Sequence, residues 1–476
     1  MTAARRPNIV LILTDDHAAH AIGAYGSVVN RTPRIDEIAA EGRVLENCFC
    51  TNSLCAPSRA SILTGAYSHV NGVTTLGAHI DASQPTFVSA LRESGYRTAI
   101  VGKWHLGDGA PHDPQGFDYW DVLVEQGEYF DPTFLSAEGR RTVPGYATDV
   151  ITDLALEWAE QQEGDAPWCL LIWHKAPHRP WEPDEAHKGM YSDPIPVPAT
   201  FGDDYATRTS AAHRATMRVA DDLTLEDLKE YPPPGLTYEE TALWKYQRYM
   251  EDYLACVASV DDNVGRVLDW LRGRELFDDT LVMYSSDQGF YLGDHGWYDK
   301  RLMYDEALRM PLLVSYPRQI PADGTRLGQI VTNVDFAQTI LEAAGVAAPE
   351  RMQGVSIWPQ LTSDPERPTR DAMYYRYYEH GDSNHGVFSH YGVRTERHKL
   401  IYFTADGEGQ PWTSNLVFTP DWELYDLVED PDELRNVVHD PAYAEVRDEL
   451  IDLLARVQRE AGDTPHPSQA LMDPRT

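Results

Sequence analysis

Two short acidic segments of this chain carry the residue types that bind a hard divalent cation. Asp15-Asp16 directly follows one apolar run, and Asp287-Gln288 closely follows another. Carboxylate and amide oxygens favour Ca²⁺ or Mg²⁺ over zinc. A helix cap or a turn is the more frequent explanation for either pair taken alone. Because each pair follows an apolar run, the two pairs together predict a metal site.

A cysteine at the start of a predicted helix is the candidate nucleophile. In the segment Cys55-Ala-Pro57-Ser58-Arg59, Pro57 suits the first helical position and the following residues can continue the helix. Cys55 would then lie just before a helix N-terminus, where free N–H groups and the helix dipole favour an anion. We expect an unmodified thiol at this place to have a lowered pKa and to be able to act as a nucleophile.

Basic side chains follow two further apolar runs and the second acidic pair. Lys103 and His105 follow one run, His178 follows another, and Lys300 comes after the second acidic pair. Lys103 and His105 would share one face if their strand continued. Each of these residues alone is more often structural or solvated. Together they predict a local cluster of positive charge.

That cluster is needed because the whole chain is strongly acidic. Its 476 residues carry a net charge of −35, a field that repels nucleic acid and anionic membranes. We therefore expect neither as a partner. An anionic substrate would be repelled as well, so its site must be locally cationic.

The apolar runs have the length and composition of buried strands in a parallel sheet. Amphipathic helical stretches separate them, the clearest running from Tyr249 to Leu271, and another from Val334 to Ala344 that stops at Gly345. This alternation predicts an α/β fold with a large, mostly parallel sheet between helices. Chemistry is expected at the carboxyl ends of the strands. The predicted strands are Asn8–Leu13, Thr98–Val101, Cys169–Trp173, Thr280–Tyr284 and Pro311–Tyr316.

The pattern changes twice along the chain. Residues 182–243 are rich in Pro and acidic residues and predict a long surface excursion, bordering the site. Beyond residue 365 short strands joined by turns precede a final helix. We predict a catalytic α/β domain over residues 1–365 and a C-terminal α+β subdomain with an antiparallel sheet over 366–476. Its predicted strands are Ala372–Tyr378, His390–Val393, Lys399–Phe403 and Trp422–Leu427.

The cysteines and the N-terminus predict a cytoplasmic protein. The five cysteines are odd in number and fit no paired metal-ligand spacing, so four of them read as reduced, buried thiols. The first apolar run is too short for a signal peptide, and Asp15-Asp16 follows it directly. No segment has the roughly 20 apolar residues of a membrane helix.

The segment Cys55-Ala-Pro57-Ser58-Arg59 followed by Leu63-Thr64-Gly65 resembles the signature of the type I sulfatases. In that family the cysteine is oxidised to formylglycine, whose hydrate supplies the attacking oxygen. The resemblance spans almost the whole chain. It implies an alkaline-phosphatase-like sandwich, hydrolysis of sulfate monoesters, Ca²⁺ (or Mg²⁺ or Mn²⁺) as cofactor and a transient encounter with a formylglycine-generating enzyme.

The resemblance also assigns roles residue by residue. Gln288 departs from the commoner Asn or His of the family, although its amide oxygen can still bind a cation. The implied metal ligands are Asp15, Asp16, Asp287 and Gln288, with the modified Cys55. The implied polar pocket has Lys103 and Lys300 on sulfate oxygens, Arg59 supporting the aldehyde hydrate, His105 as base, and His178 or Lys300 as the acid for the leaving group.

The flanking segments are most similar to carbohydrate sulfatases of the N-acetylglucosamine-6-sulfatase type, which implies a sulfated saccharide substrate. Arg376, His385 and His390 are exploratory candidates for sugar contact, with ordinary surface positions at least as frequent for such residues. A phosphodiester or phosphonate monoester hydrolase on the same scaffold is the alternative enzyme. A non-catalytic protein that kept only the fold is the alternative of another class. The oligomeric state stays open.

Overall fold

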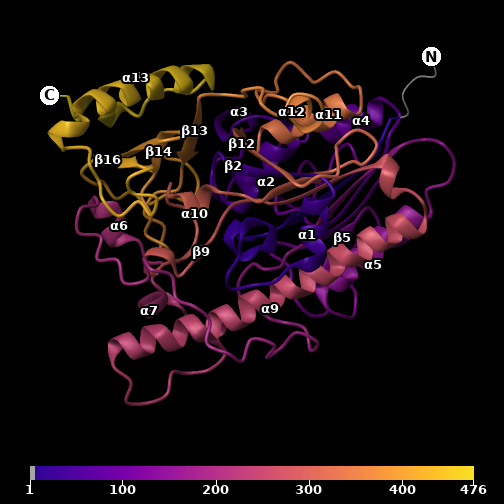
Figure 1. Ribbon diagram of the computed structural model, residues 1–476, viewed down its shortest axis with the longest axis horizontal. Helices are drawn as coiled ribbons and strands as arrows, with labels where there is room; N and C mark the ends of the chain where they lie inside the picture. The colour runs from indigo at the N-terminus through magenta and orange to yellow at the C-terminus, as the bar shows by residue number, and fades with distance from the viewer. Residues whose placement is uncertain (1–5, 476) are drawn as a thin grey trace.

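The computed structural model describes residues 6–475 of the chain, built around a ten-stranded sheet (Figure 1). Strand β1 (Asn8–Thr14) lies at its centre and pairs in parallel with β7 and β8 on its two sides. The strand order is β12 (Thr325–Thr332), β2 (Arg43–Phe49), β11 (Leu312–Ser315), β8 (Thr280–Ser286), β1, β7 (Trp168–Trp173), β3 (Arg97–Lys103), β4 (Tyr119–Leu123), β5 (Thr133–Ser136) and β6 (Gly139–Thr142).

Four of the five predicted strands are confirmed as parallel strands, and the fifth was predicted in the wrong direction. Strand β11 runs antiparallel to both β8 and β2. All four of its residues are buried. A strand buried on both faces is apolar whichever way it runs, so its composition does not encode direction.

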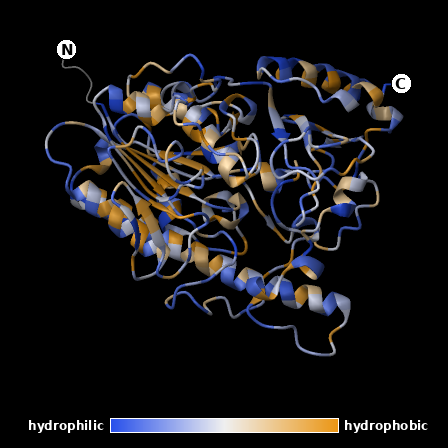
Figure 2. Ribbon diagram, turned by 180° about the vertical axis from the view of Figure 1, so that it is seen from behind, coloured by the Kyte–Doolittle hydropathy of each residue, from blue (hydrophilic) through white to orange (hydrophobic). Residues whose placement is uncertain are grey.

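The alternation of side chains along β1 divides the interior into two cores. Ile9, Leu11 and Leu13 pack on one face of the sheet, and Val10 and Ile12 pack on the other. Figure 2 shows the apolar strands enclosed by helices of mixed hydropathy. One face is covered by α1 (Pro33–Ala40), α5 (Ala147–Glu160) and the long α9 (Tyr238–Gly273), and the other by α2 (Cys55–Thr64), α4 (Phe87–Glu93) and α11 (Asp335–Ala343).

Both predicted amphipathic helices are confirmed within α9 and α11. Helix α9 begins at Tyr238, where the Thr237 hydroxyl accepts a hydrogen bond from the Glu240 N–H and the Glu240 carboxylate accepts one from the Thr237 N–H. Among residues 6–475, none of the helices is both long and apolar enough to cross a membrane. All five cysteines are buried free thiols.

A second, four-stranded antiparallel sheet forms the C-terminal part, as predicted. One of its faces packs under helix α13 (Ala444–Glu460), and the other packs through Tyr375, Ile401 and Phe403 onto the core of the large sheet. The boundary after residue 365 stays a prediction. The strands are β13 (Ala372–Tyr377), β14 (His390–Thr395), β15 (His398–Phe403) and β16 (Asp421–Asp426), in that order.

The predicted surface excursion is only partly at the surface. Arg208 is buried within it, where its guanidinium pairs with Asp203 and donates to the Glu433 carbonyl of the C-terminal part. The segment therefore joins the two parts of the protein. Its short helices are α6 (Ser210–Arg214), α7 (Val219–Asp222) and α8 (Leu225–Leu228); the remaining short elements are α3 (Ser68–Asn71), β9 (Tyr291–Leu292), β10 (Tyr298–Asp299), α10 (Asp305–Leu308) and α12 (Trp358–Thr362).

Candidate active site

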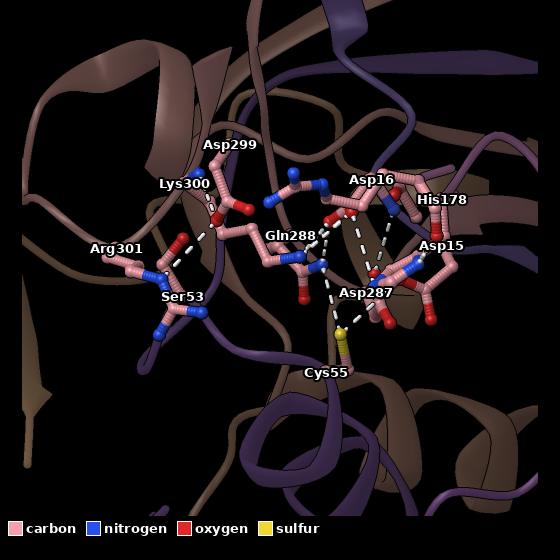
Figure 3. Close-up of polar contacts among 12 residues, drawn as sticks. Asp15, Asp16, Ser53, Cys55, His178, Asp287, Gln288, Asp299, Lys300 and Arg301 are labelled. Carbon is pink, nitrogen blue, oxygen red and sulfur yellow. Dashed lines mark hydrogen bonds and ion pairs between the residues drawn. The ribbon is translucent and has the colours of Figure 1, made fainter. Parts of the chain in front are cut away.

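The two acidic segments meet at the carboxyl ends of two adjacent strands. Thr14 pairs with Ser286, so the residues that follow β1 lie beside those that follow β8. The Asp16 N–H donates to Asp287 Oδ1 at 3.3 Å. Asp15, Asp16 and Asp287 each offer a carboxylate oxygen, and these three atoms lie within 4.8 Å of one another (Figure 3). The parallel pairing alone explains why residues some 270 positions apart converge.

Cys55 faces this carboxylate cluster from the first turn of α2. Its Sγ lies 3.4 Å from Asp15 Oδ1 and 3.8 Å from Gln288 Nε2. The helix begins at Cys55 itself rather than at Pro57, because Leu54 is the residue in extended conformation before the first turn. The reactive side chain is therefore part of the helix N-terminus, and its position is fixed by the fully buried helix α2.

The predicted lowering of the thiol pKa is wrong. Burial raises the pKa of Cys55, and the neighbouring Asp15 carboxylate raises it further, against the effect of Lys300 and Lys103. The cost of desolvating a thiolate at this buried position is the largest contribution. The unmodified thiol is protonated and is a weak nucleophile.

Three cations surround the carboxylates, as the acidity of the whole chain required. Arg59 bridges the cluster, with Nη2 2.8 Å from Asp15 Oδ2 and Nε 2.9 Å from Asp287 Oδ2. Lys103 Nζ lies 2.5 Å from Asp15 Oδ2, and Lys300 Nζ lies 2.7 Å from Asp16 Oδ1. These cations are buried, so their charges act in a medium that screens them weakly.

Even with these partners, the carboxylates are short of positive charge. Lys103 and Arg59 overcome the effect of burial and hold the pKa of Asp15 well below its usual range. Burial and the Asp15 charge raise the pKa of Asp287 to about 8. Burial, opposed in part by Lys300, raises the pKa of Asp16 to about 6. An additional cation among the three would favour their ionised forms.

The two histidines differ in their relation to the cluster. His178 Nε2 lies 3.9 Å from Asp16 Oδ2, and its Nδ1 donates to the Arg179 carbonyl at 2.5 Å. His105 does not continue strand β3, which ends at Lys103, and its φ of 56° is left-handed. The predicted shared face is therefore wrong. Burial and Lys103 lower the pKa of both imidazoles.

Cys55, His105, His178 and Lys300 line one pocket of about 720 Å³. It lies between the large sheet and the C-terminal part, which contributes Glu379, the segment 382–385 and Trp412 to its wall. None of its described lining residues belongs to 182–243, but that segment contacts residues of the lining, because Asp227 pairs with Arg179 and the Thr216 hydroxyl donates to the Asn384 carbonyl. The pocket is large enough for a saccharide unit beside the reactive residue.

Of the three exploratory candidates for sugar contact, one lines the pocket and two do not. His385 lines the pocket, 3.5 Å from Asp299 Oδ2. Arg376 instead forms ion pairs with Asp463 and Glu408. His390 is buried between aromatic rings, away from the lining. The structure thus gives Arg376 and His390 a structural role.

Sequence reasoning missed several residues of the wall. Arg301 follows Lys300 directly, with Nη1 2.9 Å from Glu379 Oε2 and Nη2 3.3 Å from His385 Nε2. Its place after Lys300 was the one available signal. Glu379 directly follows the predicted strand Ala372–Tyr378, and Trp412 stands in a segment without a recognisable pattern. Only the docking of the second sheet brings them to the pocket.

Comparison with known families identifies the class of protein that this fold and site define. Residues 7–346 match the family described as Sulfatase, and residues 293–460 match the one described as N-sulphoglucosamine sulphohydrolase, C-terminal. The chain belongs to the sulfatase family, and it is a sulfuric ester hydrolase.

Individual relatives agree with this assignment. An N-acetylglucosamine-6-O-sulfatase of Bacteroides thetaiotaomicron is 40% identical, over 96% of this chain and 87% of the relative. A solved structure of a protein in complex with its substrate, D-glucosamine-2-N,6-O-disulfate, superposes with a TM-score of 0.90 at 39% identity, covering 96% of this chain and 98% of that one.

The phosphonate monoester hydrolase of Agrobacterium radiobacter shares the fold, with a TM-score of 0.72 at 21% identity and 96% coverage of each chain. The predicted alkaline-phosphatase-like architecture is confirmed.

Proposed function

We propose that this enzyme hydrolyses the 6-O-sulfate ester of a glucosamine-type sugar, with a formylglycine made from Cys55 and a bound Ca²⁺. The observation that carries the proposal is the approach of Cys55 Sγ to Asp15 within a ring of buried cations. The 40% identical N-acetylglucosamine-6-O-sulfatase and the glucosamine disulfate complex support the choice of sugar.

The residues present fit a hard divalent cation. Asp15, Asp16, Asp287 and Gln288 would hold it together with the modified residue 55. Gln288 donates from Nε2 to Asp16 Oδ1, and its Oε1 is buried without a hydrogen-bond partner, so the amide would turn over to place that oxygen on a cation. An all-oxygen set suits Ca²⁺, with Mg²⁺ or Mn²⁺ as alternatives. When bound, the cation polarises the nucleophile and a sulfate oxygen.

Other side chains of the pocket bind the sulfate and move protons. Lys103 and Lys300 hold sulfate oxygens and neutralise the charge that grows on them. Arg59, fixed between two carboxylates, positions residue 55. A generating enzyme would oxidise Cys55 to the aldehyde, and addition of water would give a hydrate with one hydroxyl to attack sulfur. His105 would take the proton of the second hydroxyl as sulfate leaves and the aldehyde is restored.

We assign His178 as the acid that protonates the leaving alcohol, with Lys300 as the alternative. Its neutral Nε2 faces the pocket because Nδ1 donates to a backbone carbonyl. Since burial lowers the pKa of His178, it must gain its proton when the anionic substrate is bound.

We expect His178→Gln to slow the hydrolysis of substrates with poor leaving groups selectively. The kcat/KM for a sugar sulfate should fall about 10²- to 10³-fold, and that for nitrophenyl sulfate less than about tenfold, because a nitrophenolate needs no proton to leave. Steady-state kinetics with both substrates measures this. His187→Gln, at a histidine outside the pocket lining, should change neither. Equal losses for both substrates would exclude His178 as the acid and leave Lys300.

The substrate class is tested by parallel assays. We expect kcat/KM for sulfate release from glucosamine-6-sulfate to exceed that for hydrolysis of an aryl phosphodiester or a phosphonate monoester by at least about 100-fold. That ratio corresponds to a difference of about 3 kcal/mol in transition-state binding. Ion chromatography of sulfate and absorbance of the released phenol supply the two readouts. Faster phosphonate or phosphodiester hydrolysis would favour the alternative enzyme.

A further inference from the structure

An exposed tryptophan stands at the wall of the active-site pocket without a role in the chemistry above. Trp412 lies in the connection between β15 and β16, and 62% of its surface is exposed. It nevertheless lines the same pocket as Cys55 and Lys300. Covering a large exposed tryptophan ring is energetically favourable. The uncovered ring at this pocket is therefore a contact surface available to a ligand.

A glycine of the same pocket lining contacts the indole and defines its position. A Cβ placed on Gly77 would come within 2.0 Å of Cδ1 and 2.4 Å of Nε1 of Trp412. The pyrrole edge of the indole therefore rests on the backbone of Gly77. Only a residue without a side chain permits this contact, and the rest of the indole remains open to solvent.

The segment around Trp412 is held in place on both sides. Thr74 Oγ1 donates to Gln410 Oε1 at 2.8 Å, and the Ser414 N–H donates to the His380 carbonyl at 2.8 Å. Trp412 itself has a φ of 58°, which a bulky residue adopts only when its surroundings impose it. The ring is thus presented in a prearranged position, which lowers the entropic cost of binding.

The neighbouring groups suit one chemical class of ligand. Asp382, Asn384 and His79 line the same pocket and offer hydrogen-bond acceptors and donors. A pyranose ring has an apolar C–H face and an edge of hydroxyl groups. A flat aromatic ring bordered by polar side chains matches both surfaces.

We propose that Trp412 is a stacking platform for a second sugar unit, linked to the sulfated one, so that the enzyme acts on oligosaccharides. The inference rests on the proposed function, because residue 55 fixes the end of the pocket where the sulfated sugar sits. It names Trp412 as a specificity-determining residue for chain length, and Gly77 as its positioning residue.

Binding to the full chain carrying Cys55→Ala tests the platform without turnover. Isothermal titration compares glucosamine-6-sulfate with a disaccharide that carries this sugar at its non-reducing end. We expect the disaccharide to bind about tenfold more tightly, equivalent to about 1.4 kcal/mol. Adding Trp412→Ala should abolish the difference in Kd between the two sugars, and Gly77→Ala should do the same by displacing the ring. Trp412→Phe should retain most of it, because it keeps an aromatic face.

Tyr231→Ala is the matched control, since Tyr231 is an aromatic residue exposed by 76% outside the pocket lining. The ratio of the Kd values for the monosaccharide and the disaccharide should stay unchanged in this variant. The platform is overturned if the disaccharide shows no preference in the Cys55→Ala protein, or if the preference survives both Trp412→Ala and Gly77→Ala. An enzyme that binds both sugars but hydrolyses neither with Cys55 restored overturns the proposed function instead.

Discussion

Cys55→Ala is expected to lower kcat by at least about 10⁴-fold, the scale seen when a nucleophile is removed from a preorganised site. A methyl group at residue 55 has neither the thiol nor a hydroxyl that could be oxidised to the aldehyde from which the proposed nucleophile derives. The fold should persist, because the change removes one small buried atom. Kinetics and thermal unfolding of the two proteins measure both effects.

Cys256→Ala provides the control for this prediction. Cys256 is also a buried free thiol, but it lies in α9 and outside the pocket lining. We expect it to cost about 1 kcal/mol of stability and no activity. Mass spectrometry of the tryptic peptide 44–59 from the wild type should show an aldehyde at residue 55. Retained activity in Cys55→Ala, or a fully active wild type with an intact thiol, would refute the role of formylglycine.

Asp287→Asn is expected to remove the stabilisation that Ca²⁺ gives the protein. Asp287 combines complete burial with a pKa raised to about 8 by burial and by the Asp15 charge, so its carboxylate depends strongly on an added cation. For the wild type, Ca²⁺ at 100 times its Kd should add about 2.7 kcal/mol to the free energy of unfolding relative to the chelated protein. The variant should gain less than about 1 kcal/mol on the same scale.

Thermal unfolding with EDTA and with excess Ca²⁺ measures the difference. Sulfatase activity should fall about 10³-fold in the variant, because charge stabilisation of the transition state is lost. Asp269→Asn is the control, since Asp269 is an exposed carboxylate on α9 that pairs with Arg34. A calcium response in Asp287→Asn equal to that of the wild type would show that the ion binds elsewhere.

The sequence predicted the parts of the fold that depend on local patterns. The apolar run of β1 and the three- and four-residue spacing in α9 follow from burial alone, and both are confirmed. The motif around Cys55 and the acidic pairs also follow from residue type and order. Parallel pairing then brings Asp15 and Asp287 together, as expected for adjacent strand ends.

Other features depend on contacts between distant segments, which no local pattern records. The direction of β11 was not encoded because both of its faces are buried. The protonated state of the Cys55 thiol follows from desolvation beside Asp15, an effect that only packing creates. The docking of the second sheet placed Trp412 in the pocket, and packing within the C-terminal part turned Arg376 toward Asp463. The sequence by itself determined the elements and the reactive residues; tertiary packing decided their charges and the wall that faces the substrate, because burial and long-range contacts exist only in the folded chain.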